Sequence, residues 1–158
     1  MNMPQKKLPI GIQTFKEIRT EGYYYTDKTP YCLQLINQGK HYFLSRPRRF
    51  GKSLLIDTLA ELFAGNQALF EGLYIYDKWD WSIQYPVIRI SFGGGVVSNM
   101  DELNGKIDEL LCINQKALGI VCEHSSASLC FAQLIREVCK KTGQRVVILV
   151  DEYDKPIL

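Results

Sequence analysis

The stretch HYFLSRPRRFGKSLL, residues 41–55, decides the fold. A short apolar run over residues 42–44 leads into a loop that ends in Gly51-Lys52-Ser53, and a helical pattern follows. A strand, a turn and a helix N-terminus in this order are typical of a phosphate-binding P-loop. The sequence therefore predicts a strand over residues 41–45 and a helix from Gly51 or Lys52 to about residue 64.

The loop residues have predicted roles toward a bound nucleotide such as ATP. Lys52 would reach the terminal phosphates, and the Ser53 hydroxyl would be a ligand of Mg²⁺. Backbone N–H groups near the helix start would point at the anion, aided by the positive end of the helix. The predicted nucleotide-binding residues are Arg46, Arg48, Arg49, Phe50, Gly51, Lys52, Ser53 and Leu54.

The loop departs from the full pattern G-x-x-x-x-G-K-[ST] at its first position, which is Arg46. A glycine there gives the turn backbone freedom, whereas here Pro47 fixes its own φ and favours an extended conformation for Arg46. The alternative interpretation is a basic turn before an ordinary helix. The arginines of the loop fit two uses, either contact with phosphate or pairing with acidic residues.

A second candidate element lies near the C-terminus. Residues 146–150 are five consecutive apolar residues, which predicts a strand buried on both faces, and Asp151 and Glu152 follow it. Carboxylates at the carboxyl end of such a strand lie where open α/β sheets bind ligands. As in a Walker B element, Asp151 would hold Mg²⁺ and Glu152 would activate the attacking water. The alternative is a strand that ends in a solvated acidic turn.

Together these segments resemble a known family. SRPRRFGKSLL and LVDEYDKPI, with the stretches over residues 23–31 and 85–92, are similar to the AAA-ATPase-like family of predicted bacterial and archaeal P-loop ATPases. The resemblance covers residues 8–158, and the Arg-Pro-Arg-Arg-Phe before Gly51 is itself characteristic of the family. Members are typically longer and often continue into a nuclease-like domain, so the resemblance implies a nucleotide ligand and, as partners, a nuclease domain or DNA.

The predicted fold class is α/β, a partial P-loop nucleoside triphosphatase with a mostly parallel sheet and helices on both faces. Residues 1–40 would form a lead-in with a short helix, and residues 41–158 an incomplete core from Walker A to Walker B. The resemblance implies the strand order 5-1-4-3-2, with strands one, two and three at residues 41–45, 87–92 and 146–150. The C-terminal strands would then be missing, and we expect the open sheet edges to favour self-association.

The rest of the chain predicts further helices and loops. Helices are expected over residues 29–37, after the capping residue Asp27, and over residues 100–120 and 125–141. Gly93-Gly94-Gly95 reads as a flexible loop, since neither a lysine nor a close helix start follows it. The aromatic residues over 74–81 could stack on adenine or on a partner, but covering a sheet edge is the favoured interpretation.

Composition adds limits rather than a function. The net charge of +2 does not indicate a dedicated nucleic-acid binder. No apolar run reaches the ~20 residues that span a membrane, and no secretory core is visible, so we expect a cytoplasmic protein. The five cysteines contain no C-x-x-C pair and are expected to be reduced and mostly buried.

Three functions remain open at this point. The first is an ATP-binding, Mg²⁺-dependent ATPase module, with Lys52 and Glu152 as catalytic residues and Ser53 and Asp151 as metal ligands. In this stretch we expect binding rather than turnover. The second is a non-catalytic nucleotide switch or scaffold for a nuclease or DNA partner. The third is a small-molecule kinase, although no substrate lid is recognisable in the sequence.

Overall fold

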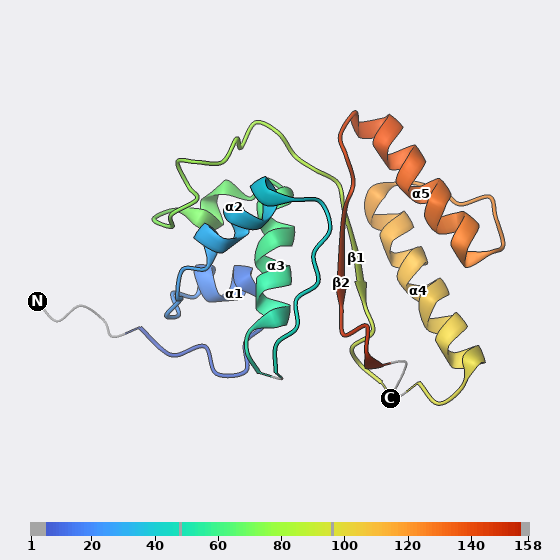
Figure 1. Cartoon of the computed structure of the whole chain (residues 1–158), viewed down its shortest axis with the longest axis horizontal. Helices are drawn as coiled ribbons and strands as arrows, with labels where there is room; N and C mark the ends of the chain where they lie inside the picture. Colours follow the sequence, from blue (N-terminus) through green and yellow to red (C-terminus); the bar gives the residue numbers. More distant parts are fainter. Residues whose placement is uncertain (1–5, 48, 96, 156–158) are drawn as a thin grey trace, which may run out of the picture. The chain divides into compact units, whose positions relative to one another are not determined.

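The computed structural model describes residues 6–47, 49–95 and 97–155 (Figure 1). These residues form two compact units that divide between residues 83 and 84, so the 46–52 loop and the Asp151-Glu152 pair lie in different units. The first unit is helical and the second combines helices with a parallel sheet, so the chain is of the α/β type. No helix of the described residues is long and apolar enough to cross a membrane.

The first unit packs its helices around an aromatic core. Helices α1 (Phe15–Thr20), α2 (Thr29–Gln38) and α3 (Lys52–Phe63) are followed by a 3₁₀ helix, η1 (Gln67–Phe70). The core consists of the buried residues Phe15, Cys32, Leu62, Phe70 and Ile75. Trp79 and Trp81 pack against this helical core, which corrects the interpretation that the aromatic stretch covers a sheet edge. Large rings are used here to fill the space between short helices.

Helix α2 begins at Thr29 as predicted, but its N-cap is Lys28 and Asp27 lies one residue before the cap. The Asp27 carboxylate accepts hydrogen bonds from the Thr29 N–H (2.8 Å) and hydroxyl (2.7 Å), and from the Tyr74 N–H (2.8 Å). Partial burial works to raise the pKa of Asp27, but these hydrogen bonds outweigh it and hold the pKa below its ordinary value. The Asp27 side chain thus joins the first residue of the helix to Tyr74, 47 residues further along the chain.

The second unit contains the sheet. Strands β1 (Val87–Ser91) and β2 (Val147–Asp151) pair in parallel, with Val87 opposite Val147 and Ser91 opposite Asp151. This pairing confirms that the second and third predicted strands are neighbours. Helices α4 (Met100–Leu118) and α5 (Ala127–Thr142) provide the crossover between the strands. Ile88 of β1 packs against Leu134 and Val138 of α5, and the figure shows both helices on one side of the sheet (Figure 1).

The two edges of this sheet differ. Asn114 of α4 is 5% exposed and bonds both backbone groups of Arg89, accepting from its N–H (3.0 Å) and donating to its carbonyl (2.8 Å). It therefore satisfies the backbone groups at the outer edge of β1 as a neighbouring strand would.

Strand β2 is less buried than predicted. Ile148 and Val150 are each 42% exposed, so the prediction of a strand buried on both faces is wrong. The two helices cover β1 and leave these side chains uncovered.

The strand predicted over residues 41–45 is not formed either. These residues belong to no strand or helix, and Tyr42, Phe43 and Leu44 are exposed. A strand needs a partner for its backbone N–H and C=O groups, and the described sheet has only β1 and β2.

The cysteines also depart from expectation. Cys122 and Cys130 form a disulfide across the turn from α4 to α5, with their Cα atoms 5.3 Å apart, because the turn brings positions eight residues apart together. Cys112 and Cys139 are exposed thiols. Only Cys32 matches the prediction of a buried thiol, and burial raises its pKa to about 12.

Candidate functional site

The 46–52 loop leads into helix α3, which begins at Lys52 as predicted. Gly51 is the N-cap, and its φ of 74° lies in the left-handed region that a glycine adopts without steric cost. The first bond of the helix joins the Leu55 N–H to the Gly51 carbonyl (3.0 Å). The N–H groups of Lys52, Ser53 and Leu54 therefore have no acceptor within the helix. This end of the helix presents unpaired donors and a positive dipole, which suits an anion.

The Lys52 side chain folds back over the loop. Its ammonium donates a hydrogen bond to the Arg46 carbonyl (2.9 Å), which joins the two ends of the loop. Arg49 has a φ of 67°, unusual for a residue with a side chain, and Phe50 is 67% exposed. The loop and the first turn of α3 thus contain the predicted nucleotide-binding residues, of which Arg48 lies outside the described residues.

Asp151 and Glu152 lie at the carboxyl end of β2, as predicted. The Glu152 N–H donates to the Asp151 carboxylate (2.9 Å), and the Phe92 N–H donates to the Asp151 carbonyl (3.2 Å). Ser91 is the register partner of Asp151, so both side chains are on the same face of the sheet. The two strand ends therefore place a hydroxyl and a carboxylate side by side at one edge.

The Glu152 carboxylate is held by groups that the sequence patterns did not indicate. Its carboxylate forms an ion pair with the Lys155 ammonium (3.0 Å), and the Lys155 N–H donates to the Glu152 carbonyl (3.1 Å). A carboxylate oxygen also lies directly against Gly93. The signal that could have indicated Gly93 is parallel pairing itself, because the residues that follow two neighbouring parallel strands meet at the same edge.

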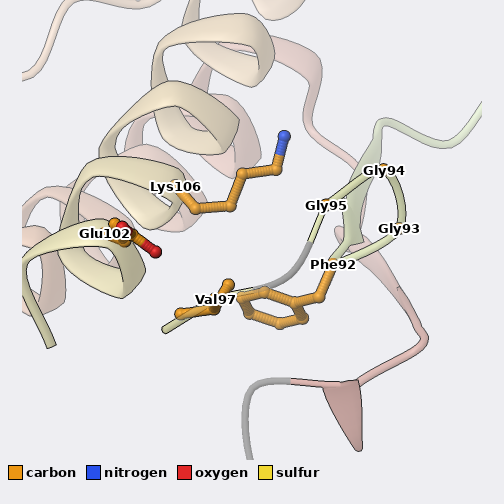
Figure 2. A pocket seen from close by; sticks show the side chains of 7 residues that line it. All are labelled: Phe92, Gly93, Gly94, Gly95, Val97, Glu102 and Lys106. Carbon is orange, nitrogen blue, oxygen red and sulfur yellow. The ribbon is translucent and has the colours of Figure 1, made fainter. Parts of the chain in front are cut away.

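The glycine loop, Gly93 to Gly95, also borders a small pocket of about 230 Å³. Figure 2 shows Phe92 and the glycine loop on one side of it and Glu102 and Lys106 of α4 on the other. Lys106 forms an ion pair with Glu109 (2.8 Å), and Glu102 accepts from the Ser98 N–H (2.8 Å). Each of these charged groups has a partner at α4 or just before it, so the described residues that line the pocket include no unpaired cation for a phosphate.

The Ser53 hydroxyl and the Asp151 carboxylate are both groups of the chemical kind that binds magnesium. Mg²⁺ prefers hydroxyl, carboxylate, phosphate and water oxygens and keeps several of its waters. Ser53 offers a hydroxyl at the start of α3, and Asp151 offers a carboxylate of which one oxygen accepts from the Glu152 N–H. Among the described residues, no three His, Cys, Asp or Glu side chains gather as a metal-binding group.

The comparisons with known proteins place the chain in a family. A family model described as "Predicted AAA-ATPase" matches residues 9–158. The chain belongs to this AAA-ATPase-like family. This membership agrees with the resemblance carried by the 46–52 loop and the acidic pair.

A relative extends the comparison. A protein of Azotobacter chroococcum mcd 1, described as "Uncharacterized protein in vnfD 5'region", is 64% identical to this family member over 157 residues. The aligned region is 99% of this chain and 30% of that protein, so the chain spans less than a third of the relative's length. No solved structure matches the chain.

Proposed function

We propose that this chain is the nucleotide-binding part of a Mg²⁺-dependent ATPase. The observation that carries the proposal is the start of α3, where unpaired N–H groups follow a left-handed Gly51 and a lysine closes the loop in front of them. Such an arrangement suits a polyphosphate, because the dipole, the donors and the ammonium all favour negative charge. Family membership supports the same ligand.

The acidic pair supplies the second half of the proposed site. A water oxygen attacks the γ-phosphorus of ATP while the Glu152 carboxylate accepts the proton that the water loses. The bond from the γ-phosphorus to the bridging oxygen breaks, and its electron pair stays on ADP. Lys52 and the loop N–H groups stabilise charge on the phosphate oxygens. Ser53 and Asp151 would hold Mg²⁺, which when bound neutralises charge on the phosphates.

Replacement of the base tests the proposal, and the experiment belongs in the full-length protein. Glu152→Gln keeps the shape of the side chain and removes its ability to accept a proton. We expect phosphate release to fall about 100-fold or more while ATP affinity is retained, since general-base catalysis contributes about 10²–10⁴-fold. Unchanged hydrolysis in this variant would show that Glu152 is not the base.

The parent protein separates hydrolysis from the alternative functions. Binding of Mg–ATP with no phosphate release supports a non-catalytic switch that acts on a partner such as a nuclease domain or DNA. Transfer of the γ-phosphate to an added acceptor, with ADP as the other product, supports a kinase.

A further inference from the structure

The loop after β1 and the turn after β2 interlock at the carboxyl edge of the sheet. The Phe92 N–H bonds the Asp151 carbonyl (3.2 Å), and the Gly93 N–H donates to the Ser91 hydroxyl (3.3 Å). These bonds hold Gly93 beside Glu152. The position of Glu152 is therefore set by the neighbouring strand as well as by its own.

Gly93 differs from the other glycines of its loop in the space around it. A Cβ built on Gly93 would overlap the Glu152 carboxylate, whereas a Cβ on Gly95 has nothing within 4 Å. Gly94 has a φ of 94°, so it serves the backbone conformation of the loop, but Gly93 has no such left-handed φ. Any larger residue at position 93 would therefore have to displace the Glu152 carboxylate from its present position.

Lys155 holds the same carboxylate from the other side. Its ammonium is 3.0 Å from a Glu152 carboxylate oxygen, and its N–H closes the turn on the Glu152 carbonyl. Glu152 itself has a φ of 53°, a conformation that a non-glycine residue keeps only where its surroundings determine it. Here the two contacts from Lys155 and the hydrogen bond from the Glu152 N–H to the Asp151 carboxylate hold this conformation.

We propose that Gly93 and Lys155 are positioning residues that seat the Glu152 carboxylate for water activation. The inference rests on the proposed function, in which Glu152 is the base. Neither residue takes part in the proton transfer itself. Gly93 leaves the space that the carboxylate occupies, and Lys155 fixes its direction by charge, so the loss of either displaces the base from the attacking water.

Two alanine variants of the glycine loop test the seat through turnover in the full-length protein. We expect Gly93→Ala to lower kcat for ATP hydrolysis about tenfold or more with KM for ATP unchanged, because a base displaced by about 1 Å acts poorly. Gly95→Ala adds the same methyl group at a position with free space around it. We expect this variant to keep kcat within about twofold of the parent, a much smaller change than the loss expected for Gly93→Ala. Equal kcat in the parent and in Gly93→Ala would overturn the proposal for Gly93.

NMR spectroscopy reports on the surroundings of the Glu152 carboxylate without any ATP hydrolysis. The side-chain carboxyl ¹³C resonance of Glu152 in the glutamate-labelled full-length protein is assigned by its loss in Glu152→Gln. We expect it to move in Gly93→Ala and to stay in place in Gly95→Ala. A resonance that is identical in Gly93→Ala and the parent would overturn the seat. If it moves as expected while Glu152→Gln still hydrolyses ATP, the seat stands and the assignment of the base fails.

The role of Lys155 is tested by a conservative and a neutral replacement. Lys155→Met keeps much of the side-chain length and removes the charge, so we expect it to lower kcat and to move the Glu152 resonance. Lys155→Arg keeps the charge and should restore both toward the parent. If Lys155→Met matches the parent in both measurements, Lys155 does not position the carboxylate.

Discussion

At the scale of single residues, the chemistry of the loop and the acidic pair was readable from the sequence because each residue type has few uses in its pattern. Gly51 followed by Lys52 at a helix start, and carboxylates after an apolar strand, lie where predicted. Gly93 and Lys155 were not predicted, since their roles depend on which segments meet in space. Asp57 was also missed, because a lone carboxylate inside a helix gives no signal that it will be buried.

Asp57 carries a prediction about stability. It is 6% exposed, and its carboxylate accepts a hydrogen bond from the Phe15 N–H at 2.7 Å, which joins α3 to the start of α1. We expect Asp57→Ala to destabilise the chain by about 1–3 kcal/mol, because it leaves a buried donor unsatisfied. Urea denaturation measures the loss, and Asp57→Asn, which keeps an acceptor oxygen, should lose less. Equal stability of the parent and the alanine variant would contradict this role.

At the scale of elements, helices were predicted better than strands. The helices at residues 29–37, 100–120 and 125–141 appear with small shifts at their ends, because periodic apolar positions and capping residues are local signals. The strand over residues 41–45 failed, and β2 is less buried than its apolar run indicated, because pairing and cover come from other parts of the structure.

Helix α2 gives a prediction about pH. The pKa of Asp27 is lowered in the folded chain, so its contribution to stability is fully present above the unfolded value near 3.8 and is lost as pH falls through the folded value. We expect the melting temperature of the parent to fall below about pH 4 more steeply than that of Asp27→Asn. Melting curves from pH 5 to pH 2.5 provide the measurement. Parallel pH profiles for the two proteins would show that Asp27 does not contribute through its charge.

At the scale of the whole molecule, the family was recognisable because its two motifs are short and each depends on local sequence. The α/β class and the parallel direction of the strands followed from strand–helix alternation, whereas the order that makes the two strands neighbours was implied by the family resemblance. The difference between the two sheet edges could not be predicted from the sequence. It depends on the Asn114 amide, which bonds the backbone of Arg89 only once α4 has packed against β1.

The outer edge of β2 has no strand partner among the described residues, which predicts self-association of residues 1–158. Val147 and Asp151 direct their backbone groups toward β1, so the alternate residues Ile148 and Val150 direct theirs away from it, and both of these residues are exposed. We expect Val150→Lys to reduce dimers and larger species in light scattering, because a charge on an edge strand opposes further pairing. Ile113→Lys, at an exposed apolar position of α4, is the matched control. A parent that stays monomeric at micromolar concentration, or equal effects of both variants, would contradict the prediction.

The central claim is that the 46–52 loop binds the phosphates of Mg–ATP, and calorimetric titration tests it most directly. Lys52→Ala should weaken binding about tenfold or more, as expected for loss of a charged hydrogen bond of about 1.5–3 kcal/mol. Lys116→Ala removes the same charge from an exposed position of α4 and should bind as the parent does. Unchanged affinity in a folded Lys52→Ala variant would contradict the assignment of the loop.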